Sequence, residues 1–459
     1  MTSSSDKDTQ TPRVIDGPGA FAIVAGSMIG IGIFLSPPIV AAHISNVWLF
    51  LAMWLFGGLT ALAGAVACAE LGAMMPRAGG DYVFQYEAFG PSIAFASGWI
   101  LFGAIFSGSI AAMSVGLCTY QLPVLLGTDL SVPALSLAGW TVSRAEVAAL
   151  MLVPLLTWLN ALGARPSART QMLLTALPIG VLLIFALYAI MTGGAGAQAA
   201  QTTRQPTTID GLAVAYMAVY FAYSGWINIV YVAGEVEKPQ RNIPFALIGG
   251  TLVITALYLL LCAGFIRVLG MGALPDAGEA GSAMATVLAG QPGRVVVTVL
   301  IASALLASIN ATVLGGARVA YAMGQRGAGW SGLGSIESES GVPRKALWLQ
   351  AVLSCLLILS GRFEQLFTMV SLTMVVTGSL TVASLFVLRA RQPDAERPYR
   401  ASGYPWLPGL YIVSSILAAA VMLVRALSGT EGAWYPLLGV VAFVAMFLAH
   451  RTVAAGKID

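Results

Sequence analysis

The stretch Gly26-Ser27-Met28-Ile29-Gly30-Ile31-Gly32-Ile33-Phe34 lies inside an apolar run, residues 17–43, that is long enough to cross a membrane. Each of its three glycines weakens a helix by roughly 1 kcal/mol relative to alanine. A second stretch, Phe221-Ala222-Tyr223-Ser224-Gly225-Trp226, places Ser and Gly in the middle of the apolar run 210–234. The sequence therefore predicts two membrane helices that are interrupted near their midpoints.

The composition of the chain indicates a protein whose solvent is lipid. Of its 459 residues, 58% are hydrophobic and only 9% are charged, whereas a soluble domain carries roughly 25% charged residues. The long runs are apolar on all sides, unlike the alternating strands of an outer-membrane barrel. We therefore expect an all-α polytopic membrane protein. The net charge of +3 is too small to suggest a nucleic-acid partner.

About twelve segments have the roughly 20 mostly apolar residues that a membrane helix needs. They lie near residues 17–43, 48–74, 91–120, 145–163, 169–192, 210–234, 244–269, 294–324, 346–361, 364–389, 406–426 and 433–450. Most of the 23 Lys and Arg residues fall in segments that are cytoplasmic if the N-terminus is inside. We therefore expect a multi-pass protein of the cell (inner) membrane, with both termini cytoplasmic.

Few side chains could build a catalytic or metal centre. The four cysteines, Cys68, Cys118, Cys262 and Cys355, stand far apart in or beside apolar runs, so neither a disulfide framework nor a zinc site is expected. Only His43 and His450 supply imidazoles, and no HExxH or GxSxG motif occurs within a span. A membrane-embedded enzyme or a sensor is the alternative from another class. We expect no enzyme activity, no cofactor and no metal.

The two glycine-rich stretches can be interpreted in two ways. Glycines in membrane helices often mark close packing between helices, and each stretch taken alone fits that interpretation. The stretches, however, fall in the first and sixth spans, at matching places in two halves of the chain. Such a pair indicates an inverted-repeat transporter. An unwound turn leaves N–H groups and carbonyls that suit a carboxylate and an ammonium group.

Longer strings resemble the amino acid–polyamine–organocation superfamily of secondary transporters. Gly30-Ile31-Gly32-Ile33-Phe34 is similar to its first-helix G-S-G-I-F motif, with Ile31 replacing the usual small residue. Three further strings resemble the superfamily. The first is Ala69–Gly72 followed by Pro76–Tyr82, and the second is Phe221–Trp226 followed by Gly234-Glu235 and Pro239–Pro244. The third is Ser308-Ile309-Asn310 with Arg318. The last of these resembles the eighth helix of L-type amino acid exchangers.

The resemblance implies a LeuT-type five-plus-five inverted repeat with helices 1 and 6 discontinuous. The repeats would span residues 15–192 and 209–391, and two further helices would occupy 405–452. Residues 1–14 and 453–459 would be cytoplasmic tails, the first of them disordered. Met1–Arg13 lacks the apolar segment of a signal peptide.

The resemblance also implies a substrate site. Its residues would be Ser27, Met28, Gly30, Ile31, Gly32, Phe221, Ala222, Ser224, Gly225, Ile105, Gly108 and Gly316. Backbone N–H groups of residues 30–32 would bind the substrate carboxylate, and carbonyls of Ser27, Met28, Phe221 and Ser224 would bind its ammonium group. Phe221 would also close the site as an aromatic gate. Ile105, Gly108 and Gly316 would line the side-chain pocket.

The chain departs from two branches of this superfamily. Pro178 stands where many L-type and cationic-group relatives carry a lysine that takes the place of a sodium ion. The sequence around it, T-A-L-P-I, looks more like that of the arginine–agmatine antiporter branch. Ile227 stands where that branch carries an acidic residue.

Charged residues within or beside spans are functional hypotheses by default. Glu70, at the end of the second span, is expected either to pair structurally or to act in gating. Arg318, in the eighth span, is expected to form a structural ion pair, with gating as the alternative. Glu235 and Glu237 lie beside Lys238 and Arg241, either in an inner gate or in a solvated loop.

The substrate follows from what the broken stretches lack. Neither contains Asp, Glu or Lys, so a cationic substrate side chain would find no counter-charge, and we expect a neutral L-amino acid moved by exchange or facilitated diffusion. The alternative is a proton-coupled amino acid or amine (cationic amino acid or polyamine) symporter or antiporter. Sodium could still bind carbonyls and hydroxyls such as those of Ser308 or Thr312.

The partners that we expect are the lipid bilayer and the amino acid substrate. The loop 121–143 contains no cysteine, so no disulfide-linked heavy chain is expected. The protein would act as a monomer or homodimer.

Overall fold

The computed structural model describes residues 13–137, 140–163, 168–192, 207–328, 330–337, 342–360, 363–427 and 437–455. Residues 1–12 of the first predicted tail and 456–459 of the second lie outside these residues, whereas 453–455 belong to the last helix, α17. The helices are α1 (Gly17–Met28), α2 (Gly32–His43), α3 (Val47–Met74), α4 (Asp81–Phe89), α5 (Pro91–Ile100), α6 (Ser107–Gly116), α7 (Leu122–Leu126), α8 (Arg144–Ala161), α9 (Ala168–Thr192), α10 (Ile209–Ala222), α11 (Asn228–Tyr231), α12 (Pro239–Ala273), α13 (Ala280–Gln325), α14 (Arg344–Ser360), α15 (Phe363–Arg391), α16 (Trp406–Leu427) and α17 (Leu437–Ala455). Two π-helical segments, η1 (Leu101–Phe106) and η2 (Leu117–Gln121), and three 3₁₀ turns, η4 (Ala233–Glu235), η5 (Leu274–Asp276) and η6 (Ser331–Gly334), complete the helical structure described.

The protein is an all-α polytopic membrane protein, as predicted. In the described part of the chain, eight helices or helix pairs are long and apolar enough to cross a membrane, and shorter apolar helices accompany them. Each segment expected from hydropathy coincides with one helix or with a series of consecutive helical elements. The strands among these residues are the short antiparallel pair β1 (Pro133–Leu137) and β2 (Trp140–Ser143).

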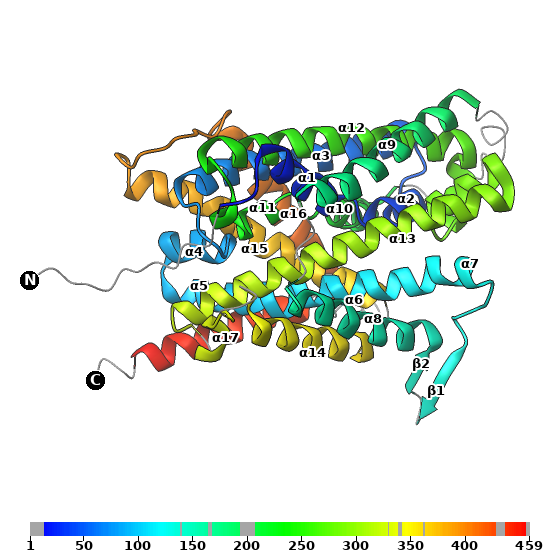
Figure 1. Ribbon diagram of the computed structural model, residues 1–459. Coiled ribbons are helices and arrows are strands. Elements are labelled where there is room, and N and C mark those ends of the chain that lie inside the picture. Colours follow the sequence, from blue (N-terminus) through cyan, green and yellow to red (C-terminus); the bar gives the residue numbers. More distant parts are fainter. Residues whose placement is uncertain are drawn as a thin grey trace, which may run out of the picture.

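The helices form one elongated bundle in which distant parts of the chain lie side by side (Figure 1). α12 packs along α1 and α3, while α10 packs against α2 and α16. The first described residues and the end of α17 lie at the same end of the bundle, and the β1–β2 hairpin lies at the other (Figure 1).

The two predicted interruptions are present. The first span consists of α1 and α2, with a break after Met28, where Ile29 takes a non-helical conformation (ψ 87°). The sixth span consists of α10, α11 and η4, and Gly225 between them has a φ of +100° that disfavours any residue with a Cβ. Gly225 therefore allows the sixth span to stop being helical in the middle of the bundle.

The third span contains an irregularity that the sequence did not indicate. Its middle is the π-helical segment η1, which changes the register of the α6 residues that follow it. Short π-helical insertions of this kind are frequent at functional sites.

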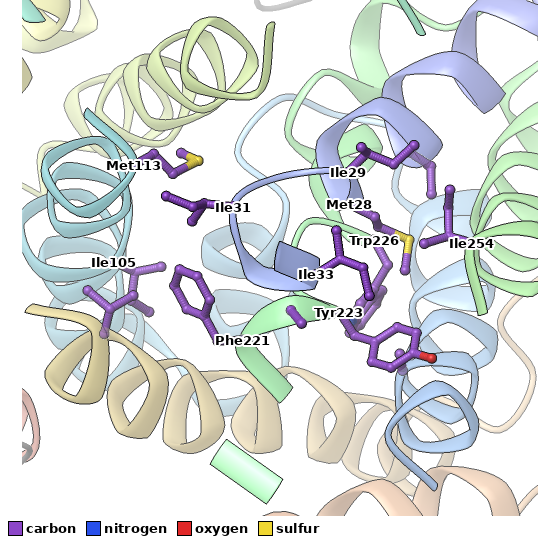
Figure 2. Close-up of a cluster of buried hydrophobic side chains, with 14 of the residues drawn as sticks. Met28, Ile29, Ile31, Ile33, Ile105, Met113, Phe221, Tyr223, Trp226 and Ile254 are labelled. Carbon is purple, nitrogen blue, oxygen red and sulfur yellow. The ribbon is translucent and has the colours of Figure 1, made fainter. Parts of the chain in front are cut away.

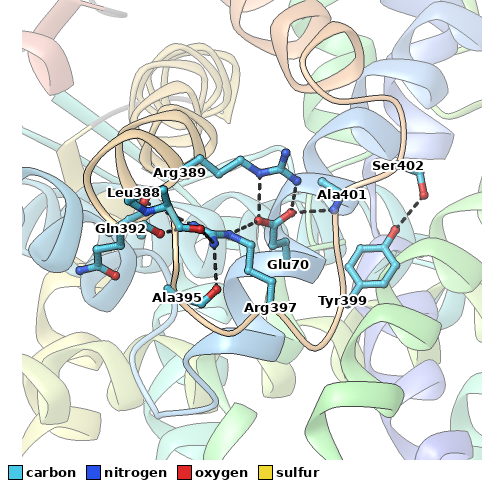
Figure 3. Close-up of polar contacts among 10 residues, drawn as sticks. Glu70, Leu388, Arg389, Gln392, Ala395, Arg397, Tyr399, Ala401 and Ser402 are labelled. Atoms are coloured by element: carbon cyan, nitrogen blue, oxygen red, sulfur yellow. Dashed lines mark hydrogen bonds and ion pairs between the residues drawn. The ribbon is translucent and has the colours of Figure 1, made fainter.

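A buried carboxylate joins α3 to α15 and to the loop after α15. Glu70 is fully buried, and its Oε2 lies 2.6 Å from Arg389 Nη2 and accepts a 2.6 Å hydrogen bond from the Ala401 amide (Figure 3). Arg397 Nε lies 3.1 Å from Glu70 Oε1. These contacts fit the structural interpretation of Glu70, and its role in gating stays a prediction.

Replacement of Glu70 tests how much this cluster stabilises the fold. Removing one partner of a buried ion pair costs about 3–5 kcal/mol, so Glu70→Gln is expected to lower the melting temperature of the detergent-purified protein strongly. The control is Glu87→Gln, because Glu87 pairs with Arg326 at 3.2 Å while its side chain is 37% exposed and such surface pairs contribute about 0–1 kcal/mol. Equal losses in the two variants would contradict this assignment.

Candidate functional site

The two helix breaks meet in the centre of the bundle. A Cβ added to Gly32 would lie 2.5 Å from the Cα of Ala222 at the end of α10. A Cβ added to Gly225 would collide with the carbonyl of Ser27 at the end of α1. The backbones of the first and sixth spans therefore touch at the helix ends beside the two breaks, and only glycine permits this approach.

One side chain from a third helix contacts both breaks. The hydroxyl of Tyr258 on α12 donates to the carbonyl of Met28 at 2.5 Å and to that of Ala222 at 3.2 Å. Tyr258 is fully buried and packs edge-on against Trp54. The hydroxyl thus partly satisfies carbonyls that the interrupted helices cannot pair themselves.

The half-helix α2 begins with backbone donors that need an acceptor. It starts at Gly32, and no side chain caps its N-terminus. The first N–H groups of an α-helix have no partner within the helix, and its dipole adds partial positive charge there. This end suits a carboxylate or another anion.

A cavity of about 70 Å³ lies at the meeting point of the breaks. Most of the residues expected at a substrate site line it: Ser27, Met28, Gly30, Ile31, Gly32, Ile105, Phe221, Ala222, Ser224 and Gly225. The ring of Phe221 lies between the side chains of Ile105 and Ile31 (Figure 2).

Gly108 and Gly316, which the sequence also assigned to the site, do not line this cavity. A Cβ on Gly108 would lie 2.5 Å from Val370 on α15, and one on Gly316 would lie 2.8 Å from the Cβ of Phe106. Both glycines therefore allow close helix packing. For Gly108 the reason is the register of α6 after η1, which turns the neighbouring Ser109 toward the cavity instead.

Sequence reasoning left other lining residues out of the site. They are Phe106, Ser109, Met113, Ile227, Asn228, Tyr231, Ser308, Thr312 and Met374. Three of them, Phe106, Ser109 and Met113, follow or end the π-helical segment, which leaves no clear pattern in the sequence. The sequence had singled out Ile227 by alignment, and Ser308 and Thr312 as hydroxyls that could bind sodium, although none of the three as a substrate-binding residue.

The cavity wall is mostly apolar and carries some polar groups, but no ionisable acid or base of the Asp, Glu, Lys, Arg or His type. Its polar side chains are hydroxyls, one amide and a phenol. Ser27 Oγ, beside the break, has no hydrogen-bond partner among the described residues, while the Thr312 hydroxyl donates to the Ser308 carbonyl at 2.8 Å. A bound charge would therefore have to be met by backbone groups and neutral dipoles.

The described residues contain no group of three or more His, Cys, Asp or Glu side chains that could hold a metal ion. The site described here is therefore built from backbone groups, hydroxyls and apolar side chains.

A salt bridge lies at the end of the sixth span formed by η4. Arg318 Nη2 on α13 lies 2.6 Å from Glu235 Oε1 at the end of η4, and both side chains are nearly buried. The Glu235 carbonyl also accepts hydrogen bonds from the amides of Val14 and Ile15 at 2.9 Å. This cluster joins the segment before α1, the end of the sixth span and the eighth span, so relative movement of these elements would have to break it.

Comparison with known proteins identifies the family. The model of the amino acid permease family matches residues 15–446. The chain belongs to this amino acid permease family. It is therefore a multi-pass transport protein of the amino acid–polyamine–organocation superfamily, rather than an enzyme.

Named relatives of this permease come from bacteria and animals. The serine/threonine exchanger SteT of Bacillus subtilis is 27% identical, with 88% of this chain and 90% of that protein covered. The b(0,+)-type amino acid transporter 1 of Mus musculus is 25% identical over 94% of this chain and 86% of that protein. The large neutral amino acids transporter small subunit 2 of the same species is 26% identical over 83% of this chain and 71% of that protein.

Substitution of Gly225 tests the importance of the contact between the two breaks. We expect Gly225→Ala to weaken amino acid binding roughly tenfold or more, because the αL-like backbone costs a residue with a Cβ roughly 1–2 kcal/mol and the new methyl group meets the Ser27 carbonyl. Binding is measured as ligand-induced thermal stabilisation of the purified permease across the proteinogenic amino acids. Gly409→Ala on α16 is the control, because its Cβ would enter open space. Wild-type affinity in Gly225→Ala would refute this placement.

Proposed function

We propose that this permease carries small neutral L-amino acids across the cytoplasmic (inner) membrane by alternating access, as an exchanger or a facilitator. The observation that carries the proposal is the cavity between the two helix breaks. It offers backbone donors, carbonyls and hydroxyls but no charged side chain. A zwitterion suits such a site because the N-terminal end of a half-helix stabilises its carboxylate and the C-terminal end of a half-helix stabilises its ammonium group. Neither charge then needs a charged side chain.

The carboxylate and the ammonium group of the substrate would bind to the ends of different half-helices. The carboxylate would accept hydrogen bonds from the N–H groups of Ile31 and Gly32, at the start of α2, because the Gly30 amide, which was also expected to bind it, already donates to the Met28 carbonyl at 2.9 Å. The ammonium group would donate to carbonyls at the ends of α1 and α10. Among these we favour the Ser27 carbonyl over that of Met28, because the Met28 carbonyl already accepts from the Gly30 amide and the Tyr258 hydroxyl.

The size of the cavity favours a small substrate. A volume of about 70 Å³ holds roughly five to seven water-sized spheres at about 10–15 Å³ each, which suits an amino acid no larger than about threonine. The hydroxyls of Ser109, Ser308 and Thr312 could receive a polar side chain, and Ile105 and Met113 an apolar one. The relative whose name specifies serine and threonine exchange supports this choice.

The proposed gates are the residues that separate the cavity from either side. Phe221 would cover the substrate from one side. The Glu235–Arg318 pair, which lies 2.6 Å apart, would hold the half-helix after the second break in the closed position. Glu70 would contribute to gating only if its cluster with Arg389 opened during the cycle.

The orientation and assembly of the permease are also proposals. The Lys and Arg bias of the loops supports cytoplasmic termini, and the proposed repeats, 15–192 and 209–391, each contain one broken span. We propose action as a monomer or homodimer without a disulfide-linked heavy chain. Loop 121–143 has no cysteine and Cys118 is buried.

Exchange in proteoliposomes tests this function. We expect uptake of labelled L-serine or L-alanine by the reconstituted permease to rise severalfold when the same unlabelled amino acid is inside the vesicles. An exchanger needs the internal substrate, whereas a facilitator also gives uptake into empty vesicles. Labelled L-arginine and putrescine are the comparison substrates, because the cavity gives a cationic side chain no counter-charge. Transport of these cations in preference to neutral amino acids would overturn the proposal and favour the cationic alternative.

A further inference from the structure

A buried carboxyl group lies beside the substrate cavity, in a place where the sequence indicated only a loop. Asp81 is the first residue of α4, the short helix between the second and third spans, and it is 3% exposed. Its Oδ2 accepts a 3.0 Å hydrogen bond from the hydroxyl of Tyr231. Its Oδ1 has no hydrogen-bond partner among the described residues.

Asp81 faces a cavity of its own. This second cavity, of about 40 Å³, is lined by Asp81 and by hydroxyl groups of Tyr220, Thr377 and Tyr411, among others. It shares a wall with the substrate cavity, formed by Ile105, Ser224, Gly225, Ile227, Tyr231 and Met374. A volume of that size admits roughly three water molecules. Asp81 is thus separated from the proposed substrate only by residues of the second helix break and its neighbours.

No positive charge compensates Asp81 in the described part of the chain. The ionisable groups around it are the phenols of Tyr231, Tyr220 and Tyr411 and the thiol of Cys68, all of which are neutral near pH 7. α5, which packs against α4, contains no ionisable side chain.

The nearest arginines on the helices packed against α4 are engaged at its other end. Arg326, after α13, pairs with Glu87 at 3.2 Å and lies over the ring of Tyr86. Arg391 of α15 donates to the Ala88 carbonyl at 2.7 Å. Asp81 therefore differs from Glu70 and Glu235, the other buried carboxylates near the inner end of the bundle, because each of those has an arginine partner.

Two opposing influences determine whether Asp81 is charged. Burial raises the pKa of Asp81 to about 7, against the smaller lowering effect of the hydroxyl groups of Tyr231 and Thr381. The N-terminus of α4 also favours the anion. The group can therefore gain or lose a proton in the physiological range.

The surroundings of Asp81 depend on the contact between α4 and the half-helix α11. The Gly79 amide donates to the Tyr231 carbonyl at 3.3 Å, and a Cβ on Gly80 would lie 2.6 Å from the Tyr231 ring. The turn before α4 thus packs directly on Tyr231. If α11 moved away, Asp81 would lose its hydrogen bond and meet water, and its anion would become favourable.

We propose that Asp81 is the proton-binding site of the transport cycle, with a neutral carboxyl group in the conformation described here and an ionised one when α4 and α11 separate. The proton passes between the carboxyl oxygen and water that enters the second cavity. This inference rests on the proposed amino acid transport. It adds that a proton bound at Asp81 is either coupled to that transport or modulates its rate.

The test is the pH profile of L-serine exchange in proteoliposomes with equal pH inside and outside. Because the cycle must pass through the protonated form, wild-type exchange should fall up to roughly tenfold from pH 6 to pH 8, as expected for one group that titrates near pH 7. Asp81→Asn keeps an oxygen acceptor for Tyr231 and is always neutral, so its exchange should stay at the low-pH rate throughout. Glu87→Gln removes an exposed carboxyl of the same helix and should leave the wild-type midpoint unchanged.

Tyr231→Phe supplies a second readout that retains Asp81. It removes the hydrogen bond that favours the anion, so the midpoint of the profile should move to higher pH. A flat wild-type profile, or an Asp81→Asn variant that keeps the wild-type profile, would overturn the proton site while amino acid transport still stood. If Asp81→Asn failed to fold, an unshifted midpoint in Tyr231→Phe would overturn it. Absence of exchange for every amino acid would instead refute the proposed function.

Discussion

The structure depends on one constraint: backbone groups inside a membrane must find hydrogen-bond partners within the protein. Two spans of this permease stop being helical in the middle of the bundle, and their free groups are not left to lipid. The Tyr258 hydroxyl contacts the last carbonyls of both α1 and α10. Glycines at 32 and 225 let the two breaks touch, which buries the unpaired groups against each other and against one cavity. The remaining donors and carbonyls are then available for a ligand.

The same constraint explains where the charges lie. A buried charge is tolerated when it is paired and hydrogen-bonded, and Glu70 and Glu235 follow this rule with arginines at 2.6 Å. Both clusters hold distant segments together away from the substrate cavity. Among the described residues, neither Glu279 nor Asp81 pairs with an arginine. Glu279 accepts hydrogen bonds from the Gly281 and Ser282 amides, whereas Asp81 accepts one from a phenol. Burial favours the neutral form of a carboxyl group in that position, whereas contact with water favours its anion, and for this reason the proton site is proposed there.

Local sequence patterns predicted much of this architecture but only part of the site. The glycine and serine positions at 26–32 and 224–225 predicted the breaks, because helix propensity is a local property. The π-helical segment Leu101–Phe106 was missed, since nothing in its composition distinguishes it from an ordinary apolar helix. The resemblance to the family pointed to Gly108, whereas its neighbour Ser109 lines the cavity. Asp81 was read as part of a loop motif because its burial depends on Tyr231, 150 residues away.

The sequence by itself determined the membrane class, the apolar spans, the two interrupted helices and the scarcity of charge around them. These properties depend on length, hydropathy and backbone preference, each of which acts over a few turns of helix. Only the tertiary structure decided which groups meet. It paired Glu70 with an arginine 319 residues away, brought Tyr258 to both breaks, and left Asp81 beside the cavity with no counter-ion among the residues that the structure describes. Such contacts depend on how helices far apart in the chain pack together, and no local pattern encodes that packing.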